Sequence, residues 1–490
     1  MSYAYILSIT LAAVLSVAVF NSNVVRGRQS QALLFLSIAF YLLLDPLHFP
    51  WLVLLAYATA LAARSITKKP PGTGRAKVLV VSLLLLAAAL GLFKIGARLA
   101  EPFSSWLGRF GIDGNLISLS LTLPIGISFF VFQLTSYLID VHRRETPAQD
   151  EFGKLMLYAF FFPRVVAGPL QRAGNFFAQL EALTPVKVNS ALEGVTRIVW
   201  GIFQKVVIAD QIAPFVDRAY EDPLSYDGVA LSLATWMYAF EIFLDFCGYT
   251  NIAIGAAMLF GFELSPNFRQ PYAAVSIADF WKRWHITLTN WLTTYIYAPI
   301  TSHRLLETGF YERSLIAVCV TFLVSGIWHG ASATFIAWGA LHALYLVLSV
   351  ATRNARSSVA RAAGLSARPK LQTVVRVVVT FNLVCLAYVL FRSEDTTTAV
   401  SIVARLPTGW DSPLQSICRF VASDGIAFML SLLGIIGGVL MNVPSACATA
   451  DRVIRSNNWT RAAVCSLMAV GIVATLEYGD PVRKFIYLRF

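Results

Sequence analysis

The chain has 490 residues, of which 57% are hydrophobic and only 13% are charged, and its formal net charge is +12. An ordinary soluble domain carries about 25% charged residues, so this composition excludes that class and indicates a polytopic membrane protein. The positive charge does not indicate nucleic-acid binding, because the basic residues gather in short segments beside apolar runs. Internal repeats, low-complexity tracts and soluble linkers are absent from the sequence, and we expect a single integral membrane domain over residues 1–490.

Apolar runs predict membrane helices along almost the whole chain. A helix needs about 20 predominantly apolar residues to cross a bilayer. Two shorter runs, residues 31–44 and 51–63, adjoin prolines and predict tilted or partial spans. We expect an all-α fold with about eleven to thirteen transmembrane helices, together with partial or amphipathic helices. The long runs are residues 3–20, 78–93, 331–350, 374–391 and 425–441.

The distribution of basic residues predicts the topology. The first apolar run is preceded by no basic residue and followed by Arg26 and Arg28, so it is not a cleaved signal peptide and the N-terminus is predicted outside. The basic segments 64–77 and 353–370 are predicted inside, because Lys and Arg are retained on the cytoplasmic side. Counting spans from there places the C-terminal tail outside as well. Residues 392–424 are the longest predicted outside connection, where an extracytoplasmic partner would bind.

Residues 278–297, with the sequence ADFWKRWHITLTNWLTTYIY, predict one amphipathic helix. Its histidine is predicted to face inward with the aromatic side chains. An interfacial helix with tryptophan anchors and a structural histidine is the alternative to a functional site. The aromatic face holds Trp281, Trp284, His285, Leu288, Trp291, Leu292 and Tyr295, and the polar face holds Lys282, Arg283, Asn290 and Thr293.

A second histidine, His329, lies in the segment SGIWHG, which is almost without charge on either side. An imidazole inside a membrane is costly unless it has a partner, and it is therefore a functional-site hypothesis. The flanking Gly326 and Gly330 permit close backbone approach or a break in the helix. A structural histidine bonded to a carbonyl of a neighbouring helix is the alternative.

Two other chemistries are disfavoured at these histidines. Zinc sites need further His, Cys or carboxylate ligands, and neither histidine has such residues at ligand spacing. Serine chemistry is disfavoured because the chain has no G-x-S-x-G motif, and Ser325 carries no sign of activation. The six cysteines lack C-x-x-C spacing and are interpreted as small hydrophobic residues. We therefore expect no metal site.

Seven motifs then follow one another in a fixed order. They are LPIGISF at 123–129, FFPRVVAGP at 161–169, DFCGY at 245–249, PNF at 266–268, DFWKRWH at 279–285, YAP at 297–299 and GIWHG at 326–330. This succession resembles the membrane-bound O-acyltransferases, and within them the bacterial branch that contains the alginate O-acetyltransferase membrane subunit and the teichoic acid D-alanyl transfer protein. The resemblance is strongest over residues 123–345 and continues to the C-terminus.

The resemblance implies a helix bundle in which a funnel from each side of the membrane meets at His329, the family's invariant histidine. It implies that His285 is the second active-site histidine, where other branches carry Asn or Asp. A cytoplasmic thioester, acetyl-coenzyme A or an acyl carrier protein, is then the donor substrate, and no cofactor is bound. An imidazole with a pKa of about 6.5 can accept a hydroxyl proton at neutral pH while the tryptophans exclude water.

The predicted substrate-binding and donor-binding residues are Trp281, Lys282, Arg283, Trp284, Trp328, Asp245 and Asn290. Lys282 and Arg283 could meet the phosphates of the donor or anchor the helix at anionic headgroups. The chain departs from related sequences at Cys247, where they carry serine, and at Asn251, where they carry aspartate. A proton relay through that acid is therefore not expected, and Asp245 could simply pair with a basic residue.

The C-terminal segment FIYLRF, residues 485–490, resembles the FIYFQF ending of polysaccharide-acetylating members. The resemblance implies that Tyr487 carries the acyl group as a covalent intermediate. A thiol with a pKa of about 8.5 and a phenol with a pKa of about 10 are successively poorer leaving groups, and an aliphatic alcohol is poorer still. Transfer from thioester to phenol ester to sugar alcohol is then downhill. A tail that only packs its aromatic side chains is the alternative.

The function expected from the sequence is transfer of an acyl group, most simply acetyl, across the bacterial inner membrane to an exported polysaccharide. The expected partner is an extracytoplasmic acyltransferase with a serine nucleophile. An O-acyltransferase for a lipid, a protein or a small metabolite is the nearest rival. A transporter is more remote, because the sequence contains no inverted repeat of broken helices.

Overall fold

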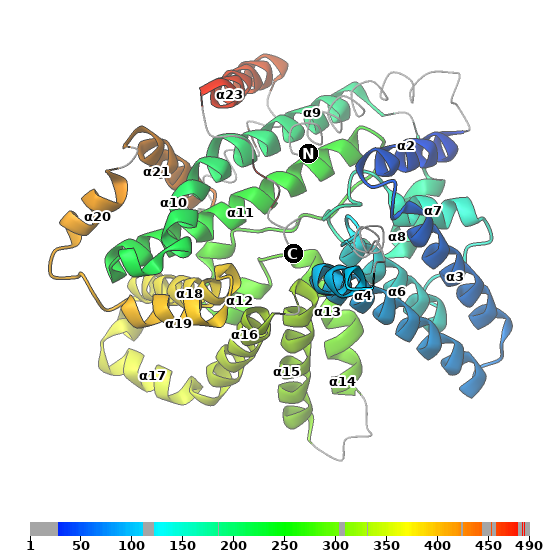
Figure 1. The fold of residues 1–490 in the computed structure, drawn as a ribbon, viewed down its shortest axis with the longest axis horizontal. Coiled ribbons are helices and arrows are strands. Elements are labelled where there is room, and N and C mark those ends of the chain that lie inside the picture. Colours follow the sequence, from blue (N-terminus) through cyan, green and yellow to red (C-terminus); the bar gives the residue numbers. More distant parts are fainter. Residues whose placement is uncertain are drawn as a thin grey trace. The chain divides into compact units, whose positions relative to one another are not determined.

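A computed structural model describes much of the chain. It contains helices and connecting segments, and the described part holds no strand, in agreement with the predicted all-α class (Figure 1). The chain divides into two compact units, Met1–Ile198 with Ile252–Ser265, and Val199–Asn251 with Pro266–Phe490. The single domain expected over the whole chain stays a prediction. The described residues are 28–110, 122–184, 186–302, 309–330, 332–422, 425–442, 452, 457–478, 483 and 485.

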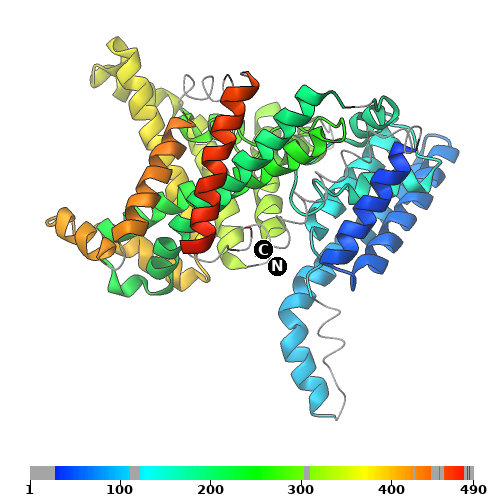
Figure 2. The same ribbon diagram turned by 90° about the horizontal axis from the view of Figure 1, so that it is seen from above.

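Unit 1 is built from helices α2 to α8, with parts of α9 and α11. Pro50 lies in the first turn of α3, where its missing N–H breaks no helical hydrogen bond. The run 51–63 therefore belongs to a full-length helix. Of the two alternatives predicted there, the partial span is wrong and the tilted span stays a prediction. Figure 2 shows the C-terminal half of α4 extending past α2 and α3. The helices are α2 Gln29–Leu44, α3 Phe49–Lys68, α4 Thr73–Gly108, α6 Ile127–Arg143, α7 Phe152–Phe160, α8 Ala173–Glu181, α9 Val188–Phe203 and α11 Gly228–Met258.

Unit 2 contains the rest of α9 and α11 and all later helices. Its largest helix pair is the antiparallel hairpin of α15 and α16, and α16 also packs on α18. The predicted runs 331–350 and 374–391 correspond to α16 and α18. The elements are η1 Gln204–Ala209, α10 Asp210–Glu221, η2 Pro223–Ser225, η3 Pro271–Ala273, α12 Ile277–Trp281, α13 Ile286–Leu292, η4 Thr293–Tyr297, α14 Ala298–Ser302, α15 Phe310–His329, α16 Ala333–Ala351, α17 Arg353–Ala362, η5 Leu365–Ala367, α18 Pro369–Arg392, α19 Thr396–Arg405, α20 Pro413–Val421, α21 Gly425–Leu440 and α23 Asn458–Tyr478.

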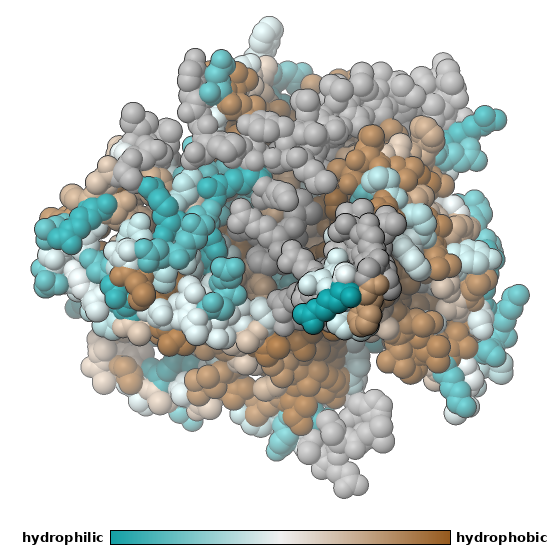
Figure 3. All heavy atoms as spheres, in the orientation of Figure 1, coloured by the Kyte–Doolittle hydropathy of each residue, from teal (hydrophilic) through white to brown (hydrophobic). Residues whose placement is uncertain are grey.

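Eight helices of the described residues are long and apolar enough to cross a membrane, and two shorter apolar helices accompany them. Their outer faces are hydrophobic: Ile327 on α15 and Leu344 on α16 are both about half exposed. Figure 3 shows apolar side chains gathered over these two helices at the bottom of the view. This is the surface expected of helices that face lipid. The full number of spans stays a prediction, and the run 3–20 lies outside the described residues.

The predicted outside connection, residues 392–424, is largely helical. It contains α19 and α20, and Asp395 caps α19 by accepting a hydrogen bond from the Thr398 N–H at 2.7 Å. Arg405 at the end of α19 donates to the Tyr226 carbonyl at 2.8 Å. The segment is thus a folded part of unit 2. The side of the membrane on which it lies stays a prediction.

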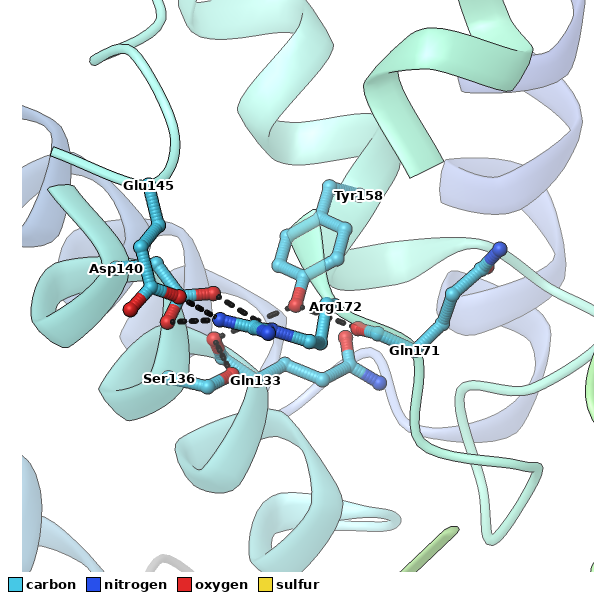
Figure 4. Close-up of polar contacts among 7 residues, drawn as sticks. All are labelled: Gln133, Ser136, Asp140, Glu145, Tyr158, Gln171 and Arg172. Carbon is cyan, nitrogen blue, oxygen red and sulfur yellow. Dashed lines mark hydrogen bonds and ion pairs between the residues drawn. The ribbon is translucent and has the colours of Figure 1, made fainter. Parts of the chain in front are cut away.

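Polar side chains in unit 1 join helices to one another. The Arg172 guanidinium binds both carboxylate oxygens of Asp140, at 3.0 and 3.2 Å. Tyr158 on α7 donates its hydroxyl to the Gln171 carbonyl at 2.9 Å. Figure 4 shows these side chains converging between α6, α7 and the segment before α8. The cluster fixes the beginning of α8 against α6 and α7.

From the sequence, His48, His142 and His303 are predicted to lie in loops and to tolerate alanine. His48 does lie in the turn between α2 and α3, but it is buried, and its Nδ1 lies 2.8 Å from the Asp45 carboxylate. The other oxygen of Asp45 accepts the Ile125 N–H at 3.0 Å. His48 therefore belongs to a structural cluster that ties the start of α3 to the segment before α6. His142 lies in the last turn of α6, so the loop predicted for it is wrong, and His303 is outside the described residues.

Candidate active site

His329 is the last residue of α15 and is enclosed by aromatic rings. Its imidazole lies edge-to-face against Trp328, Trp338 and Phe391, with ring centroids 4.6, 5.2 and 5.1 Å away. Phe335 stacks at 6.3 Å. The side chain is buried, and the enclosure comes from α15, α16 and α18. Trp328 thus lies where a substrate-binding residue was predicted, directly against the histidine.

Two glycines shape this enclosure. A Cβ atom on Gly326 would lie 2.5 Å from the Phe335 carbonyl oxygen, so α15 approaches the start of α16 more closely than any other residue allows. Gly330 ends α15, and a Cβ there would lie 2.4 Å from the Phe335 ring. Both effects predicted for this pair, close approach and a helix end, are therefore confirmed.

His285 lies in a sharp turn, and the single helix predicted over residues 278–297 is wrong. The chain forms α12, then a turn, then α13, and His285 precedes α13 with the left-handed backbone angles φ 43° and ψ 53°. Asn and Asp adopt this conformation more readily than other non-glycine residues, and the resemblance places those residues here in other branches. The predicted burial of Trp281 and Trp284 is confirmed, because Trp281 is buried at the end of α12 and Trp284 is buried in the turn that follows.

Asn267, from the motif PNF, holds the His285 turn in place. Its backbone carbonyl accepts the Ile286 N–H at 2.8 Å, and its side-chain oxygen accepts the Thr287 hydroxyl at 2.6 Å. Its amide donates to the Thr250 hydroxyl on α11 at 3.2 Å. Asn267 is completely buried. Strained backbone of this kind persists only where the surroundings fix it, and Asn267 is the residue that does so.

The ring of His285 is fully buried and packs edge-to-face on Phe246, with centroids 4.7 Å apart. Burial lowers the pKa of His285 to about 3. The imidazole is therefore neutral at pH 7 and disfavours a full positive charge. This environment suits a neutral donor or acceptor of a hydrogen bond better than a strong base.

A continuous series of aromatic contacts links the two histidines. Each ring packs on the next with centroids 4.7 to 5.8 Å apart. Both histidines therefore border one aromatic core inside unit 2, which is the arrangement needed to exclude water from a reaction between them. The series is His285, Phe246, Phe268, Trp284, Phe280, Trp281, Trp338 and His329.

The sequence reasoning missed His342 on α16. It is completely buried, and its Nδ1 accepts a hydrogen bond from the Trp281 indole at 3.3 Å. Its ring also packs edge-to-face on Trp338, which contacts His329. His342 therefore supports two of the rings around the candidate site. Its spacing of four residues from Trp338, on the same face of a helix, is the signal that could have revealed it.

The other predicted binding residues lie in different environments. Asp245 is buried and forms an ion pair with Lys205, which was the structural alternative. The Arg283 guanidinium binds the Asp279 carboxylate at 2.9 Å, whereas Lys282 is exposed. Asn290 is exposed on α13. Tyr487 lies outside the described residues, and its role stays a prediction.

The two residues that depart from the family pattern share a polar contact. Asn251 donates to the Gln204 side chain at 2.8 Å and to the Cys247 sulfur at 3.6 Å. An amide therefore fills the position of the expected acid and is held by a neutral partner. The part of the chain that the structure describes contains no group of three or more His, Cys, Asp or Glu side chains able to hold a metal ion.

Comparison with known proteins agrees with this architecture. Residues 115–388 match the model of the membrane-bound O-acyltransferase family. The chain is 35% identical to a probable alginate O-acetylase of Azotobacter vinelandii over 69% of its length, but this match spans only 64% of that relative, less than two thirds. It is 31% identical to a probable alginate O-acetylase of Pseudomonas putida over 82% of each chain. A peptidoglycan O-acetyltransferase of Helicobacter pylori is 30% identical over 75% of this chain and 71% of its own.

The fold and the enclosed histidine define a polytopic membrane protein with a buried, aromatic-lined site. The chain belongs to the membrane-bound O-acyltransferase family. The resemblance of the seven sequence motifs to this family is thereby confirmed.

Proposed function

We propose that this protein is an O-acetyltransferase that moves an acetyl group from a cytoplasmic thioester donor to an exported polysaccharide. The observation that carries the proposal is the enclosure of His329 by four aromatic rings at the end of an apolar helix. The relatives are named as O-acetylases of alginate or as an O-acetyltransferase of peptidoglycan. These names support acetyl as the transferred group and a polysaccharide as the acceptor. The donor is acetyl-coenzyme A or an acetylated carrier protein.

In the proposed reaction, His329 accepts the proton of an attacking hydroxyl. The hydroxyl oxygen bonds to the thioester carbonyl carbon, the carbon–sulfur bond breaks, and the leaving thiolate takes a proton from the imidazolium. His285, which is neutral, is suited to donate a hydrogen bond to the oxyanion that forms. The attacking hydroxyl belongs either to Tyr487, which then passes the acetyl group to the acceptor alcohol, or directly to the acceptor.

The proposed setting is the bacterial inner membrane, with both termini outside. The sequence predicts only short connections outside the membrane, which leave little mass there to hold a polymer. A separate extracytoplasmic acyltransferase with a serine nucleophile is therefore the proposed partner. The exposed residues of α19 and α20 are the proposed surface for it.

Replacement of His329 tests the proposal. In purified protein in lipid discs, His329→Ala should lower the rate of thiol release from acetyl-coenzyme A or acetylated carrier by about 10²- to 10⁴-fold. The matched control is His142→Ala, which removes a half-buried imidazole from unit 1 and should leave the rate unchanged. A near-normal rate in the His329 variant would remove this residue from the mechanism.

The acceptor is tested in cells with and without the gene. Loss of ester-linked acetate from one exported glycan supports a polysaccharide acceptor, whereas loss from lipids, proteins or small metabolites supports the rival acyltransferases. A transporter would carry its substrate across the membrane without releasing thiol from the donor. The two measurements together therefore separate the three functions.

A further inference from the structure

Three aromatic rings beside His329 pack on one another as well as on its imidazole. The Phe391 centroid lies 5.1 Å from the imidazole centroid. It also lies 5.0 Å from the centroid of Phe335 and 5.3 Å from that of Trp338. Phe335 and Trp338 themselves pack on the imidazole, at 6.3 and 5.2 Å. These three side chains, Phe335, Trp338 and Phe391, are here named the aromatic wall, and Phe391 is the member that contacts both of the others.

The aromatic wall fills the space between α16 and α18 on one side of His329. Phe335 and Trp338 lie one turn apart near the start of α16, and Phe391 lies at the end of α18. All three side chains are buried, and the Phe391 ring meets the other two edge to face. Protein interiors are packed as densely as organic crystals, so even one added methylene group is felt there. A group placed beside the imidazole therefore has little room to extend towards α18.

The backbones of α15 and α16 touch on another side of the histidine. A Cβ atom on Gly326 would lie 2.5 Å from the Phe335 carbonyl oxygen, and a Cβ atom on Gly339 would lie 2.4 Å from the Phe322 carbonyl oxygen. The two helices thus approach each other more closely than any residue but glycine allows. Along α15, these contacts lie one and two turns before His329. A hydrocarbon chain cannot pass between the helices at these contacts.

The proposed reaction brings the acyl group against these surfaces. The attacking oxygen gives its proton to His329 and bonds to the carbonyl carbon of the thioester, so both atoms lie close to the imidazole. The group attached to that carbon therefore begins beside the aromatic wall. It is a single methyl group in an acetyl donor and a longer chain in other donors. One methylene group more or less in a hydrophobic site changes kcat/KM by about 10- to 200-fold.

We infer that the aromatic wall restricts the acyl group to acetyl, and that Phe391 and Phe335 determine this specificity by the space they occupy. The inference rests on the proposed function and deepens it, because it assigns the choice of acyl group to named residues. Trp338 completes the aromatic wall, but it also packs on Trp281. Its loss would disturb the ring series as well as the wall, so the two phenylalanines are the informative positions.

A comparison of acyl donors tests the inference. The full-length protein in lipid discs receives acetyl, propionyl or butyryl groups, each on coenzyme A and on a carrier protein, and the rate of thiol release gives kcat/KM for each donor. The ratio of the acetyl value to the butyryl value is the readout, because a lower amount of folded protein changes both values equally. Wild type should favour acetyl over propionyl by about tenfold or more, and over butyryl by a larger factor.

Substitutions in the aromatic wall should lower this ratio. Phe391→Ala leaves a cavity beside His329, so its acetyl-to-butyryl ratio should fall roughly tenfold or more. Phe335→Ala should act in the same direction from α16. Phe391→Leu keeps most of the side-chain volume, and its ratio should lie between those of wild type and Phe391→Ala. This variant keeps the test valid if an alanine variant fails to fold.

Phe420→Ala is the matched control. Phe420 is a buried phenylalanine of α20 in the same unit, and it packs on Phe215 and Tyr226. Its loss should leave the ratio unchanged. A wild type that accepts butyryl as readily as acetyl, or folded wall variants that keep the wild-type ratio, would overturn the inference and leave acetyl transfer itself in place. Absence of thiol release from every donor in wild type would instead contradict the proposed function, and the inference with it.

Discussion

Among the described residues, the most deeply buried cation of unit 1 is Arg164 and that of unit 2 is Lys205, and the two are compensated in different ways. Arg164 in unit 1 is completely buried between the rings of Tyr158 and Phe176, 4.7 and 5.0 Å from its guanidinium carbon, and donates to the Tyr158 carbonyl. Lys205 in unit 2 faces two carboxylates. Burial lowers the pKa of Arg164 to about 10, which still leaves it charged at pH 7.

The difference indicates what each unit does with polar side chains. In unit 1, Arg164, Asp140 and His48 bind partners on neighbouring segments and hold the helices together. Both units also contain buried side-chain atoms without a hydrogen-bond partner among the described residues, such as the Arg164 Nε in unit 1 and the His342 Nε2 in unit 2. The units differ in the aromatic rings that surround His329 and His285 in unit 2. Unit 2 is therefore the part in which we expect the chemistry.

The largest expected effect comes from comparing a substitution of His285 in unit 2 with a substitution of His48 in unit 1. His285→Gly removes the imidazole but suits the left-handed backbone, and it should lower the rate of acetyl transfer by about 10²- to 10³-fold if the ring stabilises an oxyanion. His48→Ala should lower the free energy of unfolding by about 1–3 kcal/mol, because Asp45 loses a buried partner, with an unchanged rate per folded molecule. A normal rate for His285→Gly, or a rate loss for His48→Ala in folded protein, would contradict the division between the units.

The second prediction compares the two cations directly. Lys205→Met leaves two buried carboxylates uncompensated and should destabilise the protein by about 3–5 kcal/mol. Arg164→Met leaves no buried carboxylate behind and loses one hydrogen bond and three cation–π contacts, so we expect about 1–3 kcal/mol. Denaturation in detergent or lipid discs measures both. Asp245→Asn combined with Lys205→Met should recover part of the loss, and an absence of recovery would indicate that the carboxylates are not its cause.

Composition was sufficient to predict the all-α fold and the helices α16 and α18, because burial in lipid demands long apolar helices whatever their tertiary contacts. The motif GIWHG also located Gly326, Trp328 and Gly330 beside His329. It did not identify the other rings of the enclosure, Phe335, Trp338 and Phe391, which come from α16 and α18. The turn at His285 was missed because two short helices bury the same aromatic residues as one long helix. Periodicity therefore cannot distinguish the two arrangements.

Tertiary contacts account for the remaining errors. His48 does lie in a turn between two prolines, but its burial against Asp45 was not foreseen, because it depends on Ile125, which comes from far along the chain. His342 lies in an apolar run without a motif, and only packing on Trp281 reveals it. The partners of Lys205 span residues 210 to 485, a set that no local pattern in the sequence could assemble.

The third prediction uses the buried state of His285. Its pKa is about 3 in the folded protein and about 6.5 when unfolded, so the unfolded chain binds more protons between these values. Stability from this group is complete above pH 6.5 and falls as the pH decreases. At pH 5 the loss should be about 2 kcal/mol. His285→Asn, which keeps the left-handed turn, should lose less stability between pH 7 and pH 5 than wild type. Parallel curves would contradict the assignment.

The fourth prediction concerns His342 as a support for the site. Trp281→Phe keeps an aromatic ring against Trp338 but removes the hydrogen bond to His342, a bond worth about 0.5–1.5 kcal/mol. The expected result is a roughly three- to tenfold lower kcat with an unchanged donor KM, because the ring series beside His329 loosens. Trp291→Phe is the control, since it changes a half-buried tryptophan of α13 outside that series. Equal kcat values for the two variants would show that the bond does not support catalysis.

The smallest expected effect comes from comparing substitutions of Lys282 and Arg283. The sequence analysis gave these two residues the same predicted role. Arg283 binds Asp279 one turn earlier, so Arg283→Gln should cost about 0.5 kcal/mol of stability and leave the donor KM unchanged. Lys282 is exposed and is the better candidate to meet the phosphates of coenzyme A or phosphopantetheine. Lys282→Gln should therefore raise the apparent donor KM roughly two- to fivefold, the effect of one exposed charge pair, without changing kcat. The increase should shrink at high salt, because exposed charges are screened. If Lys282→Gln instead lowers the amount of inserted protein at constant donor KM, this lysine anchors the turn at lipid headgroups, and donor binding must be sought elsewhere in unit 2.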